Sequence, residues 1–219
     1  MNPIRRRLLG ACVLALGTTL GACQVPGSGE PPQLYTLSPK NSFAPDLPKV
    51  EWQLIVETPV AAAGLNTSRI ALQRHPLRID YYGRAAWIDP APLLVQTLLI
   101  ESFENTQRIV GVARESAQLR ADYVLQTELR EFQAEHESGG ALAVRVRLIS
   151  RLVRMPDRAI IANLSAERVE RAERGDLDGV ARAFDEALGK VLRRTVEWAL
   201  VAPGTTRRPA GGRTSVPGG

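Results

Sequence analysis

The sequence predicts an α/β domain whose sheet ends in an antiparallel meander. In residues 141–154, apolar side chains alternate with a second set that contains Arg145, Arg147 and Arg151. A period of two is that of a strand with one buried face. Residues 177–200 instead carry apolar side chains at helical spacing. Short apolar and aromatic runs, interrupted by proline, precede both.

Four short strands are expected before the first helix. Their residues are 34–37, 52–58, 70–73 and 77–82. Pro39 and Pro59 end the first two, since proline cannot donate to a strand ladder. Pro76 separates the last two, and this residue is unfavourable in a central strand.

The first helix is expected from Asp89-Pro90 to about Asn105. Apolar side chains cover most of its surface, which predicts that it is largely buried. A further strand is expected at 109–113.

The meander is expected to consist of strands 123–134, 141–154 and 159–169, joined by turns at 135–140 and 155–158. The last helix, 177–200, combines an apolar stripe with a polar face of both charge signs. Helices that lie on membranes carry a face rich in lysine and arginine. We therefore expect this helix to pack on the sheet.

The first 22 residues have the three parts of an export signal. Arg5, Arg6 and Arg7 precede an apolar run, 8–20, which is too short to span a bilayer. The next residues complete the tetrapeptide Leu20-Gly21-Ala22-Cys23, which resembles the lipobox of bacterial lipoproteins. The resemblance implies cleavage before Cys23, a diacylglycerol on its thiol and an acyl chain such as palmitate on its amine. Leu20, Gly21 and Ala22 would be recognised by the signal peptidase.

Other features of the N-terminal region bear on this hypothesis. The same tetrapeptide at 9–12 follows a single apolar residue, so Cys12 is interpreted as part of the discarded peptide. The alternative for Cys23 is a chance cysteine near an ordinary cleavage site. Gln24, where aspartate would favour the inner membrane, indicates the outer membrane. No second cysteine remains after cleavage, which excludes a disulfide within the mature chain.

The chain divides into four expected segments: a signal peptide (1–22), a flexible tether (23–32), a folded domain (33–202) and a disordered tail (203–219). Tether and tail are rich in proline and glycine. Without the six arginines of signal peptide and tail, the formal net charge falls from +5 to −1. The pI of 9.7 therefore does not indicate nucleic-acid binding.

The sequence has few candidates for catalytic residues or metal ligands. The two histidines, His75 and His136, lie in predicted loops and are interpreted as solvated loop residues rather than metal ligands. No nucleophile elbow, phosphate-binding loop or dinucleotide fingerprint occurs in the sequence. We therefore expect no catalytic residue, no metal and no cofactor apart from the covalent lipid on Cys23.

Two groups of residues, a row of arginines and a cluster of aromatic residues, can be interpreted either as binding surfaces or as ordinary parts of the fold. The row of Arg145, Arg147 and Arg151 would suit an anionic partner such as lipid phosphate. The alternative is a solvated strand face with cross-strand partners such as Glu128 or Glu170. Aromatic residues before the first helix are expected either in the core or, in part, on a contact surface. They are Trp52, Tyr81, Tyr82 and Trp87.

Several short motifs, in this order and spacing, resemble the ABC-type transport auxiliary lipoproteins, the family that includes the lipoprotein of the paraquat-inducible system. The motifs are Leu34-Tyr-Thr-Leu37, Arg69-Ile70, Tyr81-Tyr82 with Trp87 and Asp89-Pro90, the strand that opens at Ala121-Asp122-Tyr123-Val124-Leu125 and reaches Phe132, and the last helix up to Trp198. The resemblance covers about residues 33–200. It implies a three-layer α/β sandwich with helices packed on a mixed sheet, and it leaves the tail after Pro203 unexplained.

The same resemblance implies a non-enzymatic, outer-membrane lipoprotein that faces the periplasm. Its implied partners are a substrate-binding protein with a mammalian-cell-entry (Mce) domain and an ABC permease with its ATPase. Such systems move lipid, or organic solvents such as toluene, between membranes. A homo-oligomer is compatible with the family. An outer-membrane biogenesis factor that assists a β-barrel or a cell-wall synthase stays as the alternative, and a lipid-anchored hydrolase as a third hypothesis.

Overall fold

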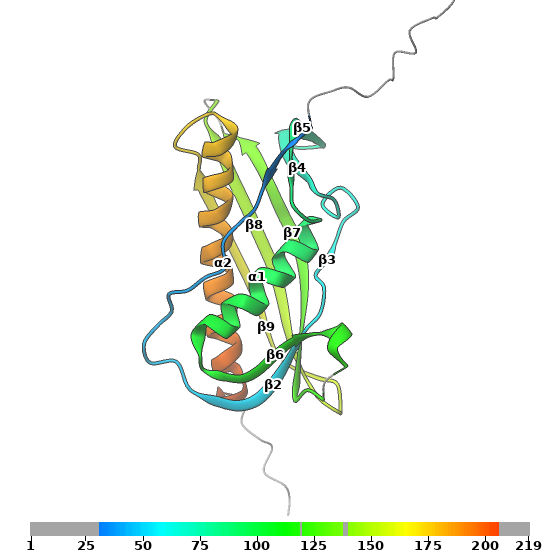
Figure 1. Ribbon diagram of the computed structural model, residues 1–219, viewed down its shortest axis with the longest axis vertical. Helices are drawn as coiled ribbons and strands as arrows, with labels where there is room; N and C mark the ends of the chain where they lie inside the picture. The colour runs from blue at the N-terminus through cyan, green and yellow to red at the C-terminus, as the bar shows by residue number, and fades with distance from the viewer. Residues whose placement is uncertain (1–30, 119, 138–139, 206–219) are drawn as a thin grey trace, which may run out of the picture. The chain divides into compact units, whose positions relative to one another are not determined.

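Most of the chain forms β-strands, and two α-helices, one in the middle and one at the end, complete the fold (Figure 1). The computed structural model describes residues 31–118, 120–137 and 140–205. In chain order its elements are β1 (Gln33–Tyr35), β2 (Val50–Val56), β3 (Val60–Ala61), β4 (Arg69–His75), β5 (Arg78–Trp87), α1 (Ala91–Thr106), β6 (Ile109–Arg114), the 3₁₀ turn η2 (Glu115–Ala117), β7 (Tyr123–His136), β8 (Leu142–Arg154), β9 (Ala159–Arg171) and α2 (Leu177–Thr205).

The long strand β7 organises the sheet. β8 pairs antiparallel along one edge of β7, from Tyr123↔Arg154 to His136↔Leu142. The other edge is shared by three short parallel strands: β2 at the start of β7, β3 near its middle and β4 near its end. β2 then carries β6, and β4 carries β5 and β1. The sheet therefore forks into two branches on the same edge of β7.

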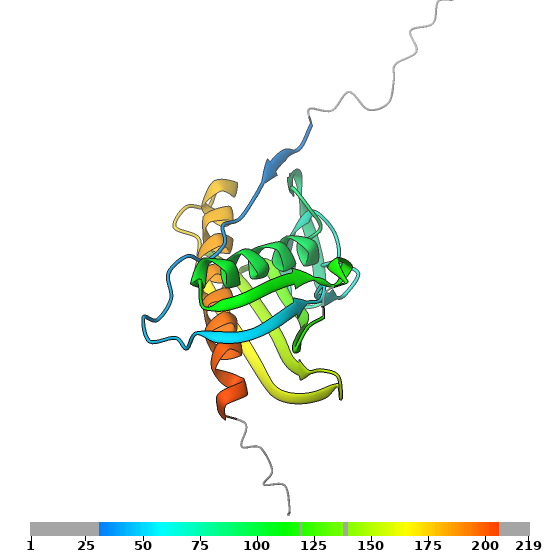
Figure 2. The ribbon, with the colours of Figure 1, turned by 60° about the horizontal axis from the view of Figure 1, so that its bottom comes forward.

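The sheet is mixed and curls like half a barrel around the helices (Figure 2). β9 pairs antiparallel with β8, and α2 packs on both. α1 packs on β2 and β6, and it also contacts α2. The predicted α/β domain with helices on a mixed sheet is confirmed. A three-layer sandwich is not, because the two helices of the described residues contact each other on the inner side of one curled sheet (Figure 1).

Several elements extend beyond their expected ends. β5 runs to Trp87 rather than Tyr82, since an irregular register with β4 lets the strand continue past Gly83. α2 continues to Thr205, and Ala202, two residues beyond the expected end, is still buried. The first three residues of the expected tail are thus helical, and the rest of the tail lies outside the described residues.

Three aromatic rings join the sheet to the last helix. Trp87 of β5, Phe132 of β7 and Phe184 of α2 are each almost fully buried. Their ring centroids lie 4.9–5.7 Å apart, in tilted and edge-to-face arrangements. Such rings contribute more to stability than other core residues because of their buried area and their ring geometry. This aromatic trio therefore ties the β4–β5 branch to β7 and α2.

Residues 36–47 form a strap that crosses both helices. Leu37 and Leu47 are buried in the core. Backbone N–H groups of the strap donate to helix side chains: Ser38 to Asp185 (2.6 Å), Lys40 to Ser102 (2.9 Å) and Ala44 to Glu197 (2.9 Å). Just before the strap, the Tyr35 hydroxyl donates to Asp178 at 2.7 Å. The strap thus has the hydrogen bonds that a backbone outside the sheet needs.

Phe184→Ala is expected to lower the free energy of unfolding by about 3–5 kcal/mol, because the change leaves a cavity between three elements. Urea unfolding of the detergent-solubilised protein, followed by tryptophan fluorescence, measures the loss. Val110→Ala is the control, since the Val110 side chain is 64% exposed, and its effect should stay within about 0.5 kcal/mol. Equal losses for the two variants would contradict the role of the trio.

Tyr35→Phe is expected to destabilise the protein in a pH-dependent way. Desolvation, followed by the hydrogen bond and charge of Asp178, raises the pKa of Tyr35 from 10.0 to about 12. The folded state therefore favours the protonated phenol. The stability gap between wild type and Tyr35→Phe should be complete below pH 10.0 and shrink as the pH rises through about 12. Thermal melts across this range test it, and a constant gap would refute it.

Candidate functional site

The predicted lipidation site lies outside the described residues. Cys23 and the recognition residues Leu20, Gly21 and Ala22 precede Pro31, where the description begins. Lipidation at Cys23 therefore stays a prediction. Neither helix of the described ranges has the length and apolarity needed to cross a bilayer.

Of the predicted arginine row, Arg145 is held by two carboxylates. Its guanidinium contacts Glu135 on β7 at 2.7 Å and Glu167 on β9 at 2.6 Å. The Glu135 side chain is only 17% exposed. Hydrogen bonds with Glu135 and then Glu167 outweigh desolvation and raise the pKa of Arg145 above its usual range. The charge of Arg145 is therefore balanced by two carboxylates of the neighbouring strands and is not free for an external anion.

The other two arginines of the row are less constrained. The Arg147 Nε lies 3.8 Å from Glu167 and has no hydrogen-bond partner. Arg151 stands between Gln126 of β7 and Asn163 of β9 in the register, both of which are uncharged. The expected partners are engaged elsewhere: Glu128 pairs with Arg130, and Glu170 with Lys190. The row is thus a strand face with cross-strand partners of its own, and Arg151 is the member best placed to meet an anion.

Both histidines line one open hollow at the tips of β4 and β7, together with Gln73, Arg74, Pro76 and Glu135. The parallel pairing of Gln73 with Glu135 brings these distant segments together. Sequence reasoning treated the histidines separately because a parallel pairing between remote strands leaves no local pattern. Glu135 is already occupied by Arg145, and the described residues contain no group of three or more side chains suited to a metal ion.

The four aromatic residues before α1 occupy different environments. Trp87 belongs to the buried aromatic trio. The Tyr81 hydroxyl donates to the Gly64 carbonyl at 3.0 Å, and the Arg69 guanidinium lies 3.7 Å from the Tyr81 ring centroid. Tyr82 is half-buried, and this burial raises the pKa of its hydroxyl. Trp52 packs edge-on against Tyr123, with 5.0 Å between ring centroids.

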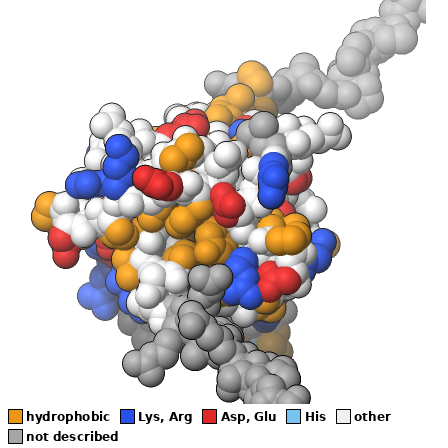
Figure 3. Space-filling view, turned by 90° about the horizontal axis from the view of Figure 1, so that it is seen from below, with side chains coloured by type: hydrophobic (Ala, Val, Ile, Leu, Met, Phe, Trp, Pro, Cys, Tyr) orange, Lys and Arg blue, Asp and Glu red, His pale blue; other side chains and the backbone are white. Residues whose placement is uncertain are grey.

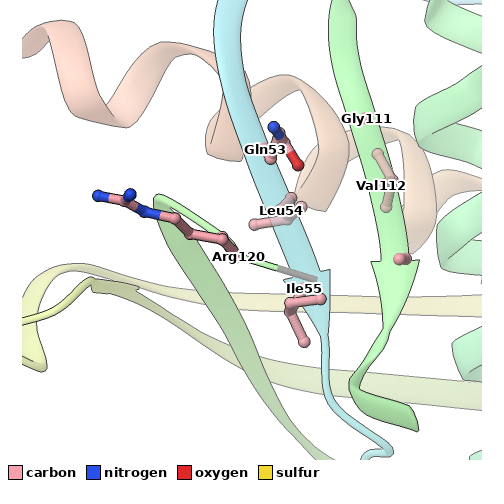
Figure 4. A pocket seen from close by; sticks show the side chains of 8 residues that line it. Gln53, Leu54, Ile55, Gly111, Val112 and Arg120 are labelled. Carbon is pink, nitrogen blue, oxygen red and sulfur yellow. The ribbon is translucent and has the colours of Figure 1, made fainter. Parts of the chain in front are cut away.

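A small hollow lies between β2 and β6 (Figure 4). Gln53, Leu54 and Ile55 line it from β2, and Gly111 and Val112 from β6, whereas the Arg120 side chain points away from both strands (Figure 4). Its space of about 160 Å³ is below the roughly 300–1,000 Å³ of small-molecule sites. This hollow is too small to enclose a lipid chain.

The end of the domain that holds β2, β6 and the last turns of α2 carries an apolar area bordered by charged side chains (Figure 3). Half-buried aromatic residues of these elements include Trp52 and Trp198, and Tyr123 begins the neighbouring strand β7. Val201 on the last turns of α2 is exposed. Ile160, next to the end of β8, is 55% exposed. We call this area the apolar end.

Arg145→Ala is expected to lower the free energy of unfolding by about 1–2 kcal/mol, allowing for solvent screening of a partly exposed side chain. The loss follows because the largely buried Glu135 side chain loses the guanidinium that it contacts at 2.7 Å. Arg151→Ala is the matched control, with an effect within about 0.5 kcal/mol. Chemical denaturation measures both variants, and similar losses would show that the Glu135 and Glu167 contacts do not stabilise the sheet.

Comparisons with known proteins assign the chain to a family. A protein from Bradyrhizobium diazoefficiens is 27% identical over 191 residues, which cover 85% of this chain; the chain spans about half the length of that relative. The crystal structure of a Xanthomonas campestris protein of the DUF330 family aligns with a TM-score of 0.75 and 27% identity, over 78% of this chain and 97% of the other. Another crystal structure, 14% identical with a TM-score of 0.59, covers 76% of this chain and 97% of its own and shares the fold. Residues 35–196 match the family model described as ABC-type transport auxiliary lipoprotein component, and the chain belongs to this family.

Proposed function

We propose that the protein is the outer-membrane lipoprotein of an ABC-type system that moves lipid, or another apolar molecule, between the inner and outer membranes. It docks the periplasmic, Mce-type substrate-binding assembly to the outer membrane. The observation that carries this proposal is the family domain at residues 35–196, which directly follows a lipobox and a short tether. A permease and an ATPase, on separate chains, supply the energy.

The two ends of β7 separate the proposed tasks of anchoring and docking. β7 spans thirteen residue steps from Tyr123 to His136, or about 40 Å at 3.3 Å per residue. The β4–β5–β1 branch, which receives the tether, joins β7 near His136, whereas β2 joins it at Tyr123. The tether therefore enters the domain far from the apolar end.

The apolar end supports the docking part of the proposal. Contact surfaces are enriched in aromatic residues and have a polar rim. Of the residues on the elements at this end, Trp52, Tyr123 and Trp198 are half-buried, whereas Ile160 and Val201 are exposed. Charged side chains surround the apolar area (Figure 3). Since the small hollow between β2 and β6 cannot enclose a lipid chain, contact with a partner protein agrees better with this end than lipid storage does.

Cys23→Ala is expected to abolish acylation and membrane association. One acyl chain anchors a protein only marginally, and two or three hold it firmly, so loss of the lipidated cysteine removes the whole anchor. Metabolic labelling with a palmitate analogue and fractionation of inner and outer membranes measure both effects. Cys12→Ala is the matched control and should leave labelling and fractionation unchanged. A Cys23→Ala variant that still fractionates with the outer membrane would refute the anchor.

Affinity purification tests the partners. The lipidated wild-type protein should recover a permease, an ATPase and an Mce-domain protein from solubilised membranes. Ile160→Arg, which places a charge on the apolar end, should reduce this recovery, and Val110→Arg, on the exposed strand β6, is its control. Recovery of β-barrel assembly or cell-wall synthesis proteins in place of these partners would favour the biogenesis function.

A further inference from the structure

The tip of the β4–β5 hairpin combines an exposed leucine with two flanking arginines. Leu77, at the turn between His75 and Arg78, is 91% exposed. Arg74 and Arg78 lie on either side of it, and Arg78 makes an exposed ion pair with Asp80 at 3.3 Å. A single exposed leucine needs no special explanation. The position of this one relative to the tether gives it significance.

The tip of the β4–β5 hairpin lies at the same end of the sheet as the N-terminal end of β1. β1 pairs parallel with the end of β5, with Leu34 opposite Ala86, and Ala86 pairs with Arg69 at the start of β4. Because β1 and β5 are parallel, the N-terminal side of Leu34 in β1 faces the same end of the sheet as Arg78, the first residue of β5. β4 takes six residue steps from Arg69 to His75, so the tip lies about 20 Å beyond Leu34 in that direction.

The length of the tether matches this distance. Eleven residue steps separate Cys23 from Leu34. With the flexibility that its composition predicts, a chain of that length spans about 18 Å on average, and it spans at most about 40 Å when fully extended. A lipid on Cys23 therefore keeps Leu34 at a distance from the bilayer that the hairpin itself can bridge.

We propose that the β4–β5 tip is a second membrane contact, which inserts Leu77 into the interface of the bilayer that holds the lipid of Cys23. This inference rests on the proposed anchoring at Cys23. Leucine partitions into the acyl boundary, and arginines at the same depth pair with lipid phosphates. Arg74 provides the stronger phosphate contact, because Arg78 shares its charge with Asp80.

The consequence is orientation. A single lipid attachment restrains distance but not rotation, and a second contact about 20 Å from Leu34 fixes which end of the domain faces the membrane. With the tip on the bilayer, the His136 end of β7 lies toward the membrane, and the apolar end at Tyr123 lies at the far side. The weak second contact thus directs the domain without adding much to its anchoring.

A single-cysteine label tests the contact on the lipidated protein. The mature chain has no thiol other than Cys23, which is acylated in the proposed anchor, so Leu77→Cys provides one reactive site for an environment-sensitive NBD fluorophore. Ile160→Cys, at the apolar end, is the matched control. Each protein is reconstituted into phosphatidylethanolamine–phosphatidylglycerol vesicles with or without a lipid-borne nitroxide quencher, and flotation is measured first.

The label at position 77 is expected to be quenched severalfold more by the nitroxide lipid than the label at 160. Flotation with equal, weak quenching at both positions overturns the hairpin contact and leaves the anchor intact. Shielding of label 77 from aqueous iodide without lipid quenching indicates a protein contact and also overturns the proposal. Loss of flotation overturns the anchor and the hairpin contact together.

Removal of one positive charge from the tip gives an independent check. Arg74→Gln in the Leu77→Cys protein is expected to reduce lipid quenching severalfold, because the tip loses its unpaired guanidinium. Arg194→Gln in the same background is the control, since it removes an exposed arginine from α2 instead. Unchanged quenching in Arg74→Gln would refute the phosphate contact.

Discussion

The pairing of both edges of β7 is the constraint on which the rest of the structure depends. A fourteen-residue strand presents a row of backbone N–H and C=O groups on each edge. Such groups cost free energy when they are buried without a hydrogen-bond partner. β8 satisfies one row along its length, whereas β2, β3 and β4 divide the other. Because three separate segments share one edge, the sheet forks and curls around α1 and α2, and the aromatic trio closes the space between them.

This arrangement also separates two ends of the domain. The fork places the strand that receives the tether and the apolar end at opposite ends of β7. The family to which the chain belongs is described as an ABC-type transport auxiliary component. In our proposals the lipid attaches the domain to the membrane. The β4–β5 tip then orients the domain, and the apolar end contacts the partner protein.

The sequence predicted the elements better than their arrangement. The alternation in β8 and the stripe in α2 are local, so both were predicted close to their observed ends. The fork was not, since parallel pairing of β2 and β4 with β7 joins segments far apart in the chain. The same limit hid the carboxylate partners of Arg145 and the shared hollow of His75 and His136. Exposure of Leu77 had no signal in the sequence, because its run resembles any short strand. Cys23, with the strongest local motif, lies where the structure gives no description.

The strap and β1 have a mechanical consequence. A pull on the tether acts along β1, and because β1 runs parallel to β5, the hydrogen bonds between them bear the load together in shear rather than opening one after another. The load also reaches Asp178 of α2 from Tyr35 of β1, and Asp185 of α2 and Ser102 of α1 through the strap. A force along β1 is thus distributed over the sheet and both helices, so the N-terminal attachment of the domain resists a pull in that direction.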